Sequence, residues 1–243
     1  MYKDIKIFVV NHALNQSALD LAASLRTCFQ VELHDSGSIL SDDERGGFDY
    51  VWGNIGYAGL INAVCARLAE ADDRHPVGFI CSDVSVPDPS GLQERLQRAF
   101  ENEQVALYAP ASTGSNHPHM HPRRGIALRR VSFVDGFCFF ARAAIFREVC
   151  PIDVTKNRLG WGIDKQFGYA AAHGGALVVV DDAITVGHPN VSGYRRDEAS
   201  RQRDEWLADK PRAERIFQKL ATNFVLRDGI GAAALAAFIR NVS

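Results

Sequence analysis

A single carboxylate, Asp83, follows the largely apolar residues 77–82 and precedes a turn-forming sequence rich in Ser and Pro. A buried strand that ends on an acidic side chain is how open α/β sheets present a reactive group, because ligands bind just beyond the carboxyl ends of the strands. Three other polar features follow apolar segments: an Asp-Ser-Gly-Ser sequence at 35–38, Asp164 after a Gly-Trp-Gly-Ile sequence, and His188. We expect these groups to line one crevice.

Hydrophobic periodicity predicts the strands and helices that would position these groups. Strands are expected at residues 5–10, 29–34, 50–52, 77–82, 105–109, 176–180 and 183–186, and an apolar segment surrounds Gly136 at 133–142. Helices are expected at residues 16–28, 59–71, 90–101 (with Ser90 as the N-cap), 143–149, 165–173 and 211–226, and loops at 41–48 and 112–130. This order favours an α/β fold whose mainly parallel central sheet is flanked by helices on both faces.

The pattern predicts one large domain, residues 1–190, followed by a C-terminal helical extension, residues 191–243, that packs on or beside it. The apolar segment 230–239 is too short to span a bilayer, which takes about 20 residues. A docked tail or a homodimer contact through the C-terminal helices is the favoured interpretation. Attachment to the inner surface of a membrane is the lesser alternative.

Composition limits the classes of function. The chain has 243 residues, of which 47% are hydrophobic and 23% charged, as in ordinary globular proteins. A net charge of −2 shows no excess of basic residues of the kind that binds nucleic acid, so no nucleic-acid partner is expected. The five cysteines lack zinc-finger or Cys-x-x-Cys spacing, which indicates buried thiols in a reducing compartment. With neither a signal peptide nor a transmembrane run expected, the prediction is a cytoplasmic protein.

Two sequence elements near the start of the chain resemble the GT-A glycosyltransferases, closest to the family 2 type. That family carries Asp-x-x-Ser after its second strand, matched here by Asp35 and Ser38. It also carries Asn-x-Gly and a second Asn six residues after the Gly, matched by Asn54, Gly56 and Asn62. The resemblance runs from about residue 6 to about residue 188.

The same family has a metal-binding Asp-x-Asp motif at the end of its central strand. Asp83 falls on the second Asp, and Cys81 stands where the first would be. Gly136 matches a Gly-centred apolar strand, and Asp164 matches the Asp of a Glu-Asp helix start whose Glu is Ile163 here. The order of the elements carries the resemblance, since each is common alone.

The resemblance implies transfer of a sugar from a nucleotide-diphosphate donor to a hydroxyl of a glycan or lipid-linked acceptor, as in polysaccharide biosynthesis, by one inverting displacement. Asp83 and His188 would hold Mn²⁺ or Mg²⁺, which neutralises the charge of the departing diphosphate. Asp164 would be the general base. The donor-binding residues implied are Asp35, Ser38, Asn54, Gly56, Asn62, Gly136 and Trp161.

Two other functions stay open. A sugar-phosphate nucleotidyltransferase shares the sheet and the metal chemistry, but it opens with a Gly-rich basic loop where this chain has Asn-His-Ala-Leu-Asn at 11–15. A non-catalytic nucleotide-sugar-binding domain is favoured by Cys81 and Ile163, which replace acidic residues of the family.

Structural roles are the alternative for each site residue. Asp83, Asp35 and Asp164 could be turn or capping residues, His188 could close a strand, and Trp161 could be core packing rather than a sugar platform. The His-Pro-His-Met-His run at 117–121 is interpreted as a mobile, solvent-exposed loop rather than a metal site. The four arginines beside it are interpreted mainly as solvated charges, with anion contact as the alternative: Arg123, Arg124, Arg129 and Arg130.

Overall fold

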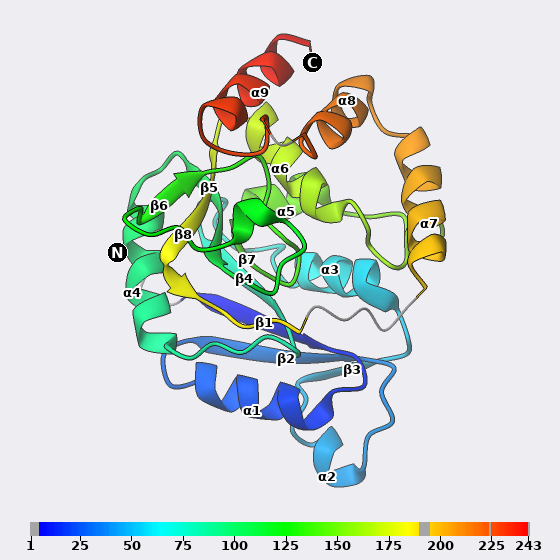
Figure 1. Cartoon of the computed structure of the whole chain (residues 1–243). Helices are drawn as coiled ribbons and strands as arrows, with labels where there is room; N and C mark the ends of the chain where they lie inside the picture. The colour runs from blue at the N-terminus through cyan, green and yellow to red at the C-terminus, as the bar shows by residue number, and fades with distance from the viewer. Residues whose placement is uncertain (1–4, 190–194, 224, 243) are drawn as a thin grey trace.

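An eight-stranded sheet runs through the centre of the molecule in the order β3-β2-β1-β4-β7-β5-β8-β6 (Figure 1). The computed structural model describes residues 5–189, 195–223 and 225–242, so the predicted domain boundary between 190 and 191 lies outside the described residues. The strands are β1 (Lys6–Asn11), β2 (Gln30–Ser36), β3 (Tyr50–Trp52), β4 (Pro76–Cys81), β5 (Val105–Ala111), β6 (Leu128–Arg130), β7 (Cys138–Arg142) and β8 (Leu177–Thr185).

The predicted mainly parallel sheet is confirmed. Strands β3, β2, β1 and β4 pair in parallel, and so do β5 and β8. Strand β7 lies between these two groups and is antiparallel to both β4 and β5, so the two groups point the same way. Strand β6 is antiparallel to β8 at one edge. Among the described strands, only β6 and β7 therefore run against the common direction.

Helices cover both faces of the sheet. The helices are α1 (Asn15–Leu25), α2 (Asp42–Arg45), α3 (Gly56–Ala66), α4 (Pro89–Glu101), α5 (Ala143–Val149), α6 (Ile163–His173), α7 (Arg196–Ala208), α8 (Arg212–Leu220) and α9 (Gly229–Val242), with a 3₁₀ turn, η1, at Pro118–Met120. Helices α1 and α4 pack on one face, and α3, α5 and α6 pack on the other. None of these described helices combines the length and the apolar character that crossing a membrane requires.

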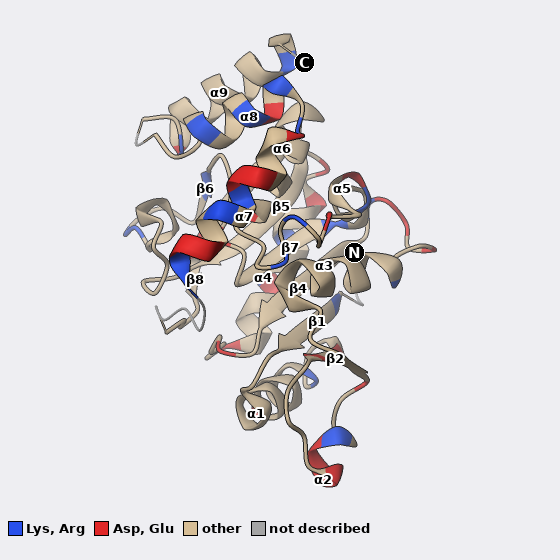
Figure 2. Cartoon of the chain, turned by 90° about the vertical axis from the view of Figure 1, so that its right-hand side faces the viewer, with Lys and Arg blue, Asp and Glu red and all other residues tan. Residues whose placement is uncertain are grey.

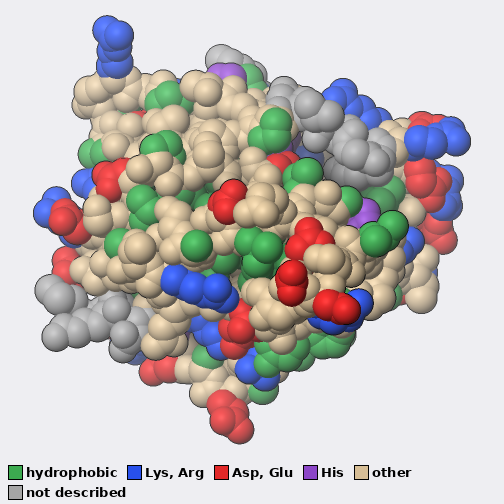
Figure 3. Space-filling view, turned by 90° about the horizontal axis from the view of Figure 1, so that it is seen from below, with side chains coloured by type: hydrophobic (Ala, Val, Ile, Leu, Met, Phe, Trp, Pro, Cys, Tyr) green, Lys and Arg blue, Asp and Glu red, His purple; other side chains and the backbone are tan. Residues whose placement is uncertain are grey.

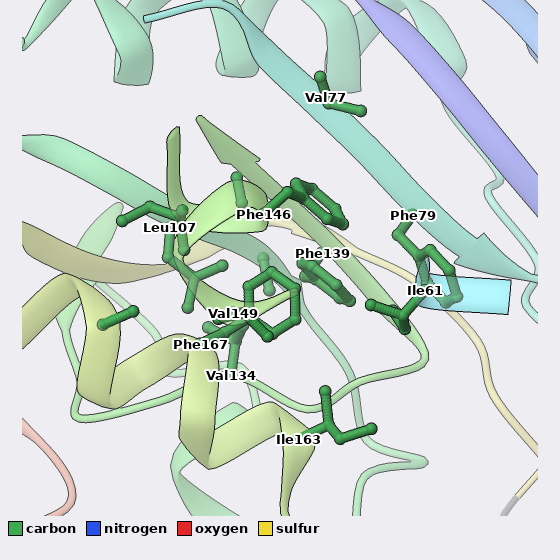
Figure 4. Packing of buried hydrophobic residues seen from close by; sticks show 14 of the residues in the cluster. Ile61, Val77, Phe79, Leu107, Val134, Phe139, Phe146, Val149, Ile163 and Phe167 are labelled. Carbon is green, nitrogen blue, oxygen red and sulfur yellow. The ribbon is translucent and has the colours of Figure 1, made fainter. Parts of the chain in front are cut away.

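Successive side chains of each strand point to opposite faces of the sheet, and this alternation produces one apolar core on each face. In β1, Ile7 and Val9 face the α1/α4 side, whereas Phe8 and Val10 face the α3/α5/α6 side, as the two-residue period of a strand requires. Figure 4 shows the second core, in which four phenylalanine rings from β4, β7, α5 and α6 gather. Fully burying each ring stabilises the fold by roughly 2–3 kcal/mol.

The C-terminal helices pack against α6 at the end of the molecule opposite α1 and α2 (Figure 1). A third apolar cluster joins them to the domain: Phe133, Ala172, Phe217, Ala221, Leu235, Ala236 and Ile239. Helix α7 buries Trp206 in the α3/α5/α6 core and carries bands of both charge signs on its outside (Figure 2). Seen from below, acidic, basic and apolar side chains are interspersed over the face of the molecule (Figure 3).

Two predicted loops contain regular structure. Within 41–48, a capping box closes the short helix α2: Ser41 Oγ accepts from the backbone of Glu44, and the Glu44 carboxylate accepts from the Ser41 backbone. Within 112–130, residues 118–120 form η1 and residues 128–130 add β6 to the sheet edge. These elements are too short to show a periodic pattern.

Other boundaries also differ from the prediction, since α1 ends at residue 25 instead of 28 and α3 spans 56–66 instead of 59–71. One strand, β8, replaces two, because its pairing with β5 continues through a register shift. Asp88 rather than Ser90 caps α4, since its carboxylate accepts from Gly91 N at 2.9 Å. Helix α8 ends at Leu220 instead of residue 226, and Ser132 binds the carbonyls of Leu226 and Arg227 beyond it.

Candidate active site

The carboxyl ends of six described strands lie along one edge of the sheet, and the antiparallel strand β7 starts at this edge. Ile80 of β4 is paired with Cys138 of β7, and Cys81 N donates to Phe137 O at 2.8 Å. The residues that precede β7 therefore reach the place where β4 delivers Asp83. Strand direction, rather than sequence proximity, brings these segments together.

Asp83 and His188 meet because the segments after β4 and β8 pair with each other. Ser85 N donates to Gly187 O at 2.9 Å, and Gly187 N donates to Ser85 O at 3.0 Å. His188 Nε2 then lies 3.3 Å from Asp83 Oδ2. A Cβ at Gly187 would stand 2.3 Å from Ser85 Oγ, so any other residue there would require the Ser85 side chain to rotate. The structure thus brings together the two residues predicted to bind a metal.

The surroundings of His188 favour its charged form. Its ring stacks on Phe137 with centroids 4.1 Å apart. Burial lowers the pKa of His188, but the hydrogen bond and charge of Asp83, the charge of Asp135 and the Gly114 carbonyl outweigh burial and raise the pKa overall. An anionic environment of this kind also attracts a cation.

Asp135 is the third carboxylate of the site. Burial, and after it the charge of Asp164, raise the pKa of Asp135 against the opposing effects of His117, Ser115 and His188. Ser115 Oγ donates to Asp135 Oδ2 at 2.7 Å. Asp135 therefore couples the Asp83–His188 pair electrostatically to Asp164.

The Asp83–His188 pair fits a hard divalent cation. Asp83 Oδ1 is buried, and no group in the described part of the chain donates a hydrogen bond to it. Burial raises the pKa of Cys81 well above its ordinary value, so that side chain stays a neutral thiol and supplies no charge. Within the described residues, no cluster of three His, Cys, Asp or Glu side chains could hold a metal ion. Carboxylate oxygen suits Mn²⁺ or Mg²⁺, provided that a bound ligand contributes further oxygens, and the imidazole of His188 is a ligand for a transition-metal ion such as Mn²⁺ rather than for Mg²⁺.

Asp164 lies in the first turn of α6, next to a histidine from the 115–121 loop. Gly162, at φ 86°, precedes the helix. His117 Nε2 lies 3.7 Å from Asp164 Oδ2. A Cβ at Gly136 would lie 3.9 Å from the Cβ of Asp164, so the start of the β7 segment runs beside the carboxylate. Asp164 thus faces the same site as Asp135.

The interpretation of residues 117–121 as a mobile, solvent-exposed loop is wrong. His119 is 1% exposed, and its Nε2 lies 3.0 Å from Phe133 O. His121 Nε2 contacts Ser115 O at 2.9 Å. Burial, followed by the charge of His117, lowers the pKa of His119 to about 3. The loop is packed, and it presents His117 to Asp164.

Arg129 holds this loop and is not the solvated charge that was expected. Its guanidinium donates to the carbonyls of His119 at 2.7 Å and His121 at 3.0 Å. The same group pairs with Asp182, which is fully buried. The neighbouring Arg123 pairs with Asp228 at the surface.

Asp35 and Ser38 lie in a polar cradle at the ends of β1 and β2. Asp35 is fully buried and accepts from Asn11 Nδ2 at 2.8 Å and Ser38 N at 2.9 Å, and Ser38 Oγ also donates to it. Ser38 Oγ accepts from Ala13 N at 2.8 Å. The cradle includes the expected Asx-type turn, and its buried carboxylate is fixed by Asn11.

Tyr57 fills the space between two glycines. Its hydroxyl donates to Gly136 O at 2.7 Å. A Cβ at Gly136 would lie 2.6 Å from that hydroxyl, and one at Gly160, which has φ 81°, would lie 2.3 Å from the ring. Gly136 was predicted to let a ligand approach the backbone, and in the structure Tyr57 takes that space.

The remaining predicted donor residues are dispersed. Gly56 (φ 70°) and Asn54 contact Arg158, which donates to Asn54 O. Asn62 Nδ2 donates to Ile152 O at 2.8 Å, and Asn62 Oδ1 accepts from Ile152 N at 2.8 Å. These two hydrogen bonds indicate a structural role. Trp161 is partly buried, and its carbonyl accepts from Asn157 Nδ2 at 2.9 Å.

Sequence reasoning missed four residues of the site: Asn11, Tyr57, His117 and Asp135. Asp135 and Tyr57 each adjoin a glycine that was singled out, and this neighbourhood could have identified them. His117 was noticed but assigned to solvent. Its position depends on the burial of His119 and on the hydrogen bonds that Arg129 donates to the carbonyls of His119 and His121, and no local sequence pattern reveals either.

No protein-family model matches the chain, and no curated protein matches its sequence. Among solved structures, it is similar to the mannosyltransferase PcManGT from Pyrobaculum calidifontis in complex with GDP-Man and Mn²⁺, with a TM-score of 0.61, 13% identity, and coverage of 97% of this chain and 73% of that one. It is also similar to GalNAc-T7 with UDP, GalNAc and Mn²⁺, with a TM-score of 0.55, 12% identity, and coverage of 97% of this chain and 54% of that one. The chain has a GT-A-like fold.

Proposed function

We propose that this protein is a glycosyltransferase that moves a sugar from a nucleotide-diphosphate donor to an acceptor hydroxyl, with Mn²⁺ or Mg²⁺ as cofactor. One observation carries the proposal. In a GT-A-like fold, Asp83 and His188 lie 3.3 Å apart at the carboxyl edge of the sheet, and the buried Asp83 Oδ1 accepts no hydrogen bond from the described residues. The two similar structures, the mannosyltransferase PcManGT and GalNAc-T7, are both complexes with Mn²⁺.

Asp83 and His188 would hold the cation in this proposal. A bound divalent cation neutralises charge on a leaving diphosphate. The stack of His188 on Phe137 and the pairing of Ser85 with Gly187 orient both side chains before any ligand arrives. Such preorganisation lowers the cost of binding.

The donor would lie along the ends of β1, β2 and β3. Asp35 is fully buried and would act indirectly, by holding the partly exposed Ser38 in place beside the nucleoside. Asn54, Gly56, Gly136 and Trp161 stay predicted donor contacts, whereas Asn62 supports the site through Ile152. By analogy with the neighbours, whose complexes contain GDP-Man or UDP, we expect a hexose on GDP or UDP.

Asp164 would remove the proton from the acceptor hydroxyl as it attacks the anomeric carbon. A carboxylate within hydrogen-bond reach of the attacking hydroxyl can serve as a general base. One displacement assisted by one base inverts the anomeric configuration. His117, 3.7 Å from Asp164, helps to position the carboxylate.

The remaining parts of the proposal concern partners and place. A glycan or lipid-linked acceptor, a role in polysaccharide biosynthesis and a cytoplasmic location with peripheral membrane contact stay predictions. So do the homodimer and the division into residues 1–190 and 191–243. The outer side of α9 supports the homodimer, because Ile230, Phe238 and Val242 are exposed there while the opposite side of the helix is docked.

A panel of nucleotide sugars, each with and without Mn²⁺, tests the function. The true donor should raise the unfolding temperature of the protein only when Mn²⁺ is present, because a ligand stabilises the state that binds it. Asp83→Asn should abolish this stabilisation and lower donor hydrolysis or transfer at least about 100-fold. Asp164→Asn should keep the stabilisation and lose turnover by about 100- to 10,000-fold.

Asp43→Asn, an exposed change in α2, is the matched control and should alter neither quantity. Turnover that survives in Asp83→Asn would remove the metal assignment, and turnover that survives in Asp164→Asn would assign the base elsewhere. Binding of a donor without turnover by the unaltered protein would favour the second candidate, a non-catalytic nucleotide-sugar-binding domain. The neutral Cys81 thiol and the buried Ile163 favour that candidate.

A further inference from the structure

Two cysteines face each other where α3 packs against α5, away from the candidate active site. Cys65 Sγ donates to Phe146 O at 3.6 Å, and Cys150 Sγ donates to Ile61 O at 3.9 Å. Phe146 precedes Cys150 by four residues, and Ile61 precedes Cys65 by four residues. Each thiol therefore reaches the helical turn that carries the other cysteine.

The pair differs from the other three cysteines. Cys28, Cys65, Cys81 and Cys150 are all partly exposed, but only Cys65 and Cys150 have thiols that each reach the helical turn of the other. Burial holds the pKa values of Cys81 and Cys138 well above the ordinary value, which makes both thiols inert. Cys28 is partly exposed, and its thiol contacts Thr27 Oγ1 at 3.4 Å.

The two thiols of the pair have unequal acidity. The hydrogen bond from Cys150 is the main cause that lowers the pKa of Cys65, to about 7, with the charge of Arg147 as a smaller cause against burial. The same hydrogen bond raises the pKa of Cys150. A cysteine that is substantially thiolate near neutral pH is the better nucleophile, so Cys65 is the residue that reacts first.

We propose that Cys65 and Cys150 form a reversible intramolecular disulfide by exchange with a small-molecule disulfide such as glutathione disulfide. The Cys65 thiolate attacks one sulfur of the small disulfide, forms a mixed disulfide and releases one small thiolate. Cys150 then loses its proton to solvent and attacks Cys65 Sγ, which releases the second small thiolate. The cysteine pair is oxidised by two electrons, and one small disulfide is reduced to two thiols.

This bond would fasten α3 to the chain that follows α5. The side-chain amide of Asn62 in α3 already forms two hydrogen bonds with the backbone of Ile152, one to its carbonyl and one from its N–H. Ile152 leads on to Gly160, which packs against Tyr57 near the start of α3. The bond would therefore add a covalent link to a contact that supports the site, and the inference does not depend on the proposed sugar transfer.

Peptide mapping of the full chain tests the proposal. The protein is incubated with glutathione disulfide in excess over glutathione, free thiols are blocked by alkylation, and the peptides are analysed by mass spectrometry without reduction. We expect a linked peptide containing Cys65 and Cys150, with Cys81 and Cys138 still free thiols. The bond should raise the thermal unfolding midpoint by roughly 5 °C or more, and reduction should reverse this.

Single variants separate the two chemical steps. In Cys150→Ser the reaction should stop at a mixed disulfide of glutathione with Cys65, whereas in Cys65→Ser residue 150 should stay a thiol. In Cys150→Ala the alkylation of Cys65 should also shift to higher pH, because the side chain that lowers the pKa of Cys65 is removed. A persistent mixed disulfide on Cys65 in the unaltered protein, or linkage of either cysteine to Cys28, would overturn the proposal.

Discussion

Cys81 stands two residues before Asp83, where the resembled family has a second carboxylate. Its thiol is neutral, and the second carboxyl group of this region is that of Asp135, whose pKa is raised by burial. Asp135 precedes an antiparallel strand and reaches the site from the opposite direction. At the scale of single residues, the site therefore has a second carboxyl group without the missing Asp of the family motif.

Gly160→Ala should lower the free energy of unfolding by about 2–4 kcal/mol, since the new Cβ meets the Tyr57 ring at 2.3 Å and φ is 81°. Gly125 is the matched control, because its φ is 77° but nothing lies within 4 Å of its Cβ position. Gly125→Ala should cost only about 1 kcal/mol, the strain of positive φ. Urea unfolding measures both, and equal losses would contradict the packing of Tyr57 against Gly160.

His119 should make the protein sensitive to acid. Its pKa is about 3 in the folded state and near 6.5 in an unstructured chain, so below pH 6.5 the unfolded state binds the extra proton. The stability that the neutral ring provides is complete above pH 6.5 and is lost as the pH falls from 6.5 towards 3. His119→Gln should flatten the fall of unfolding free energy with pH across this window, as measured by urea unfolding at each pH. A parallel fall in both proteins would contradict this role.

At the scale of elements, the loop between β5 and β6 is the part of the site most dependent on support from elsewhere. Ser115 hydrogen-bonds to Asp135, and the ring of His119 packs on Phe133. The loop is therefore held against the residues that precede β7. Arg129 of β6 ties the loop to β8 through Asp182. The position of His117 is thus set by two strands at the edge of the sheet.

Arg129→Met should lower the free energy of unfolding by about 3–5 kcal/mol, because the buried Asp182 loses its partner. Hydrogen exchange should accelerate at residues 115–121, where two carbonyls lose their donor. Arg124→Met is the control, because this side chain is exposed. If amide hydrogen exchange at residues 115–121 is equally fast in the two variants, Arg129 does not hold the loop.

At the scale of the whole molecule, the C-terminal helices extend the α3/α5/α6 side of the sandwich outward. Helix α6 is the shared element, since it packs on the sheet through Phe167 and on the C-terminal cluster through Ala172. Because Asp164 begins α6, the packing of α8 and α9 also stabilises the helix that carries the proposed base. Gln218 of α8 reinforces this by donating to Gly162 O at 2.8 Å.

Leu235→Ala should lower the free energy of unfolding by about 2–4 kcal/mol, because Leu235 is 2% exposed within the C-terminal cluster. Ile230 of the same helix is 91% exposed, so Ile230→Ala should change stability by less than about 0.5 kcal/mol. Chemical denaturation compares the two. Similar values would mean that α9 is not docked as the structure has it.

Local patterns were sufficient to predict the alternating strands and helices, the mainly parallel sheet and the polar residues that follow strands at Asp35, Asp83 and His188, whereas Asp164 lies at a helix start rather than at a strand end. Apolar blocks and their periods are properties of neighbouring residues, so a single sequence carries them. Helix ends and the elements of three or four residues escaped prediction, because capping partners and edge pairing decide them rather than periodicity.

Tertiary structure alone decided which polar groups share the site. Asp83 meets His188 through pairing of Ser85 with Gly187, and Asp135 arrives only because β7 runs antiparallel. The packing of His119 and the bonds of Arg129 place His117, and no local pattern reveals either. Strand direction and register depend on contacts between residues far apart in the chain, and such contacts leave no periodic trace among neighbouring residues.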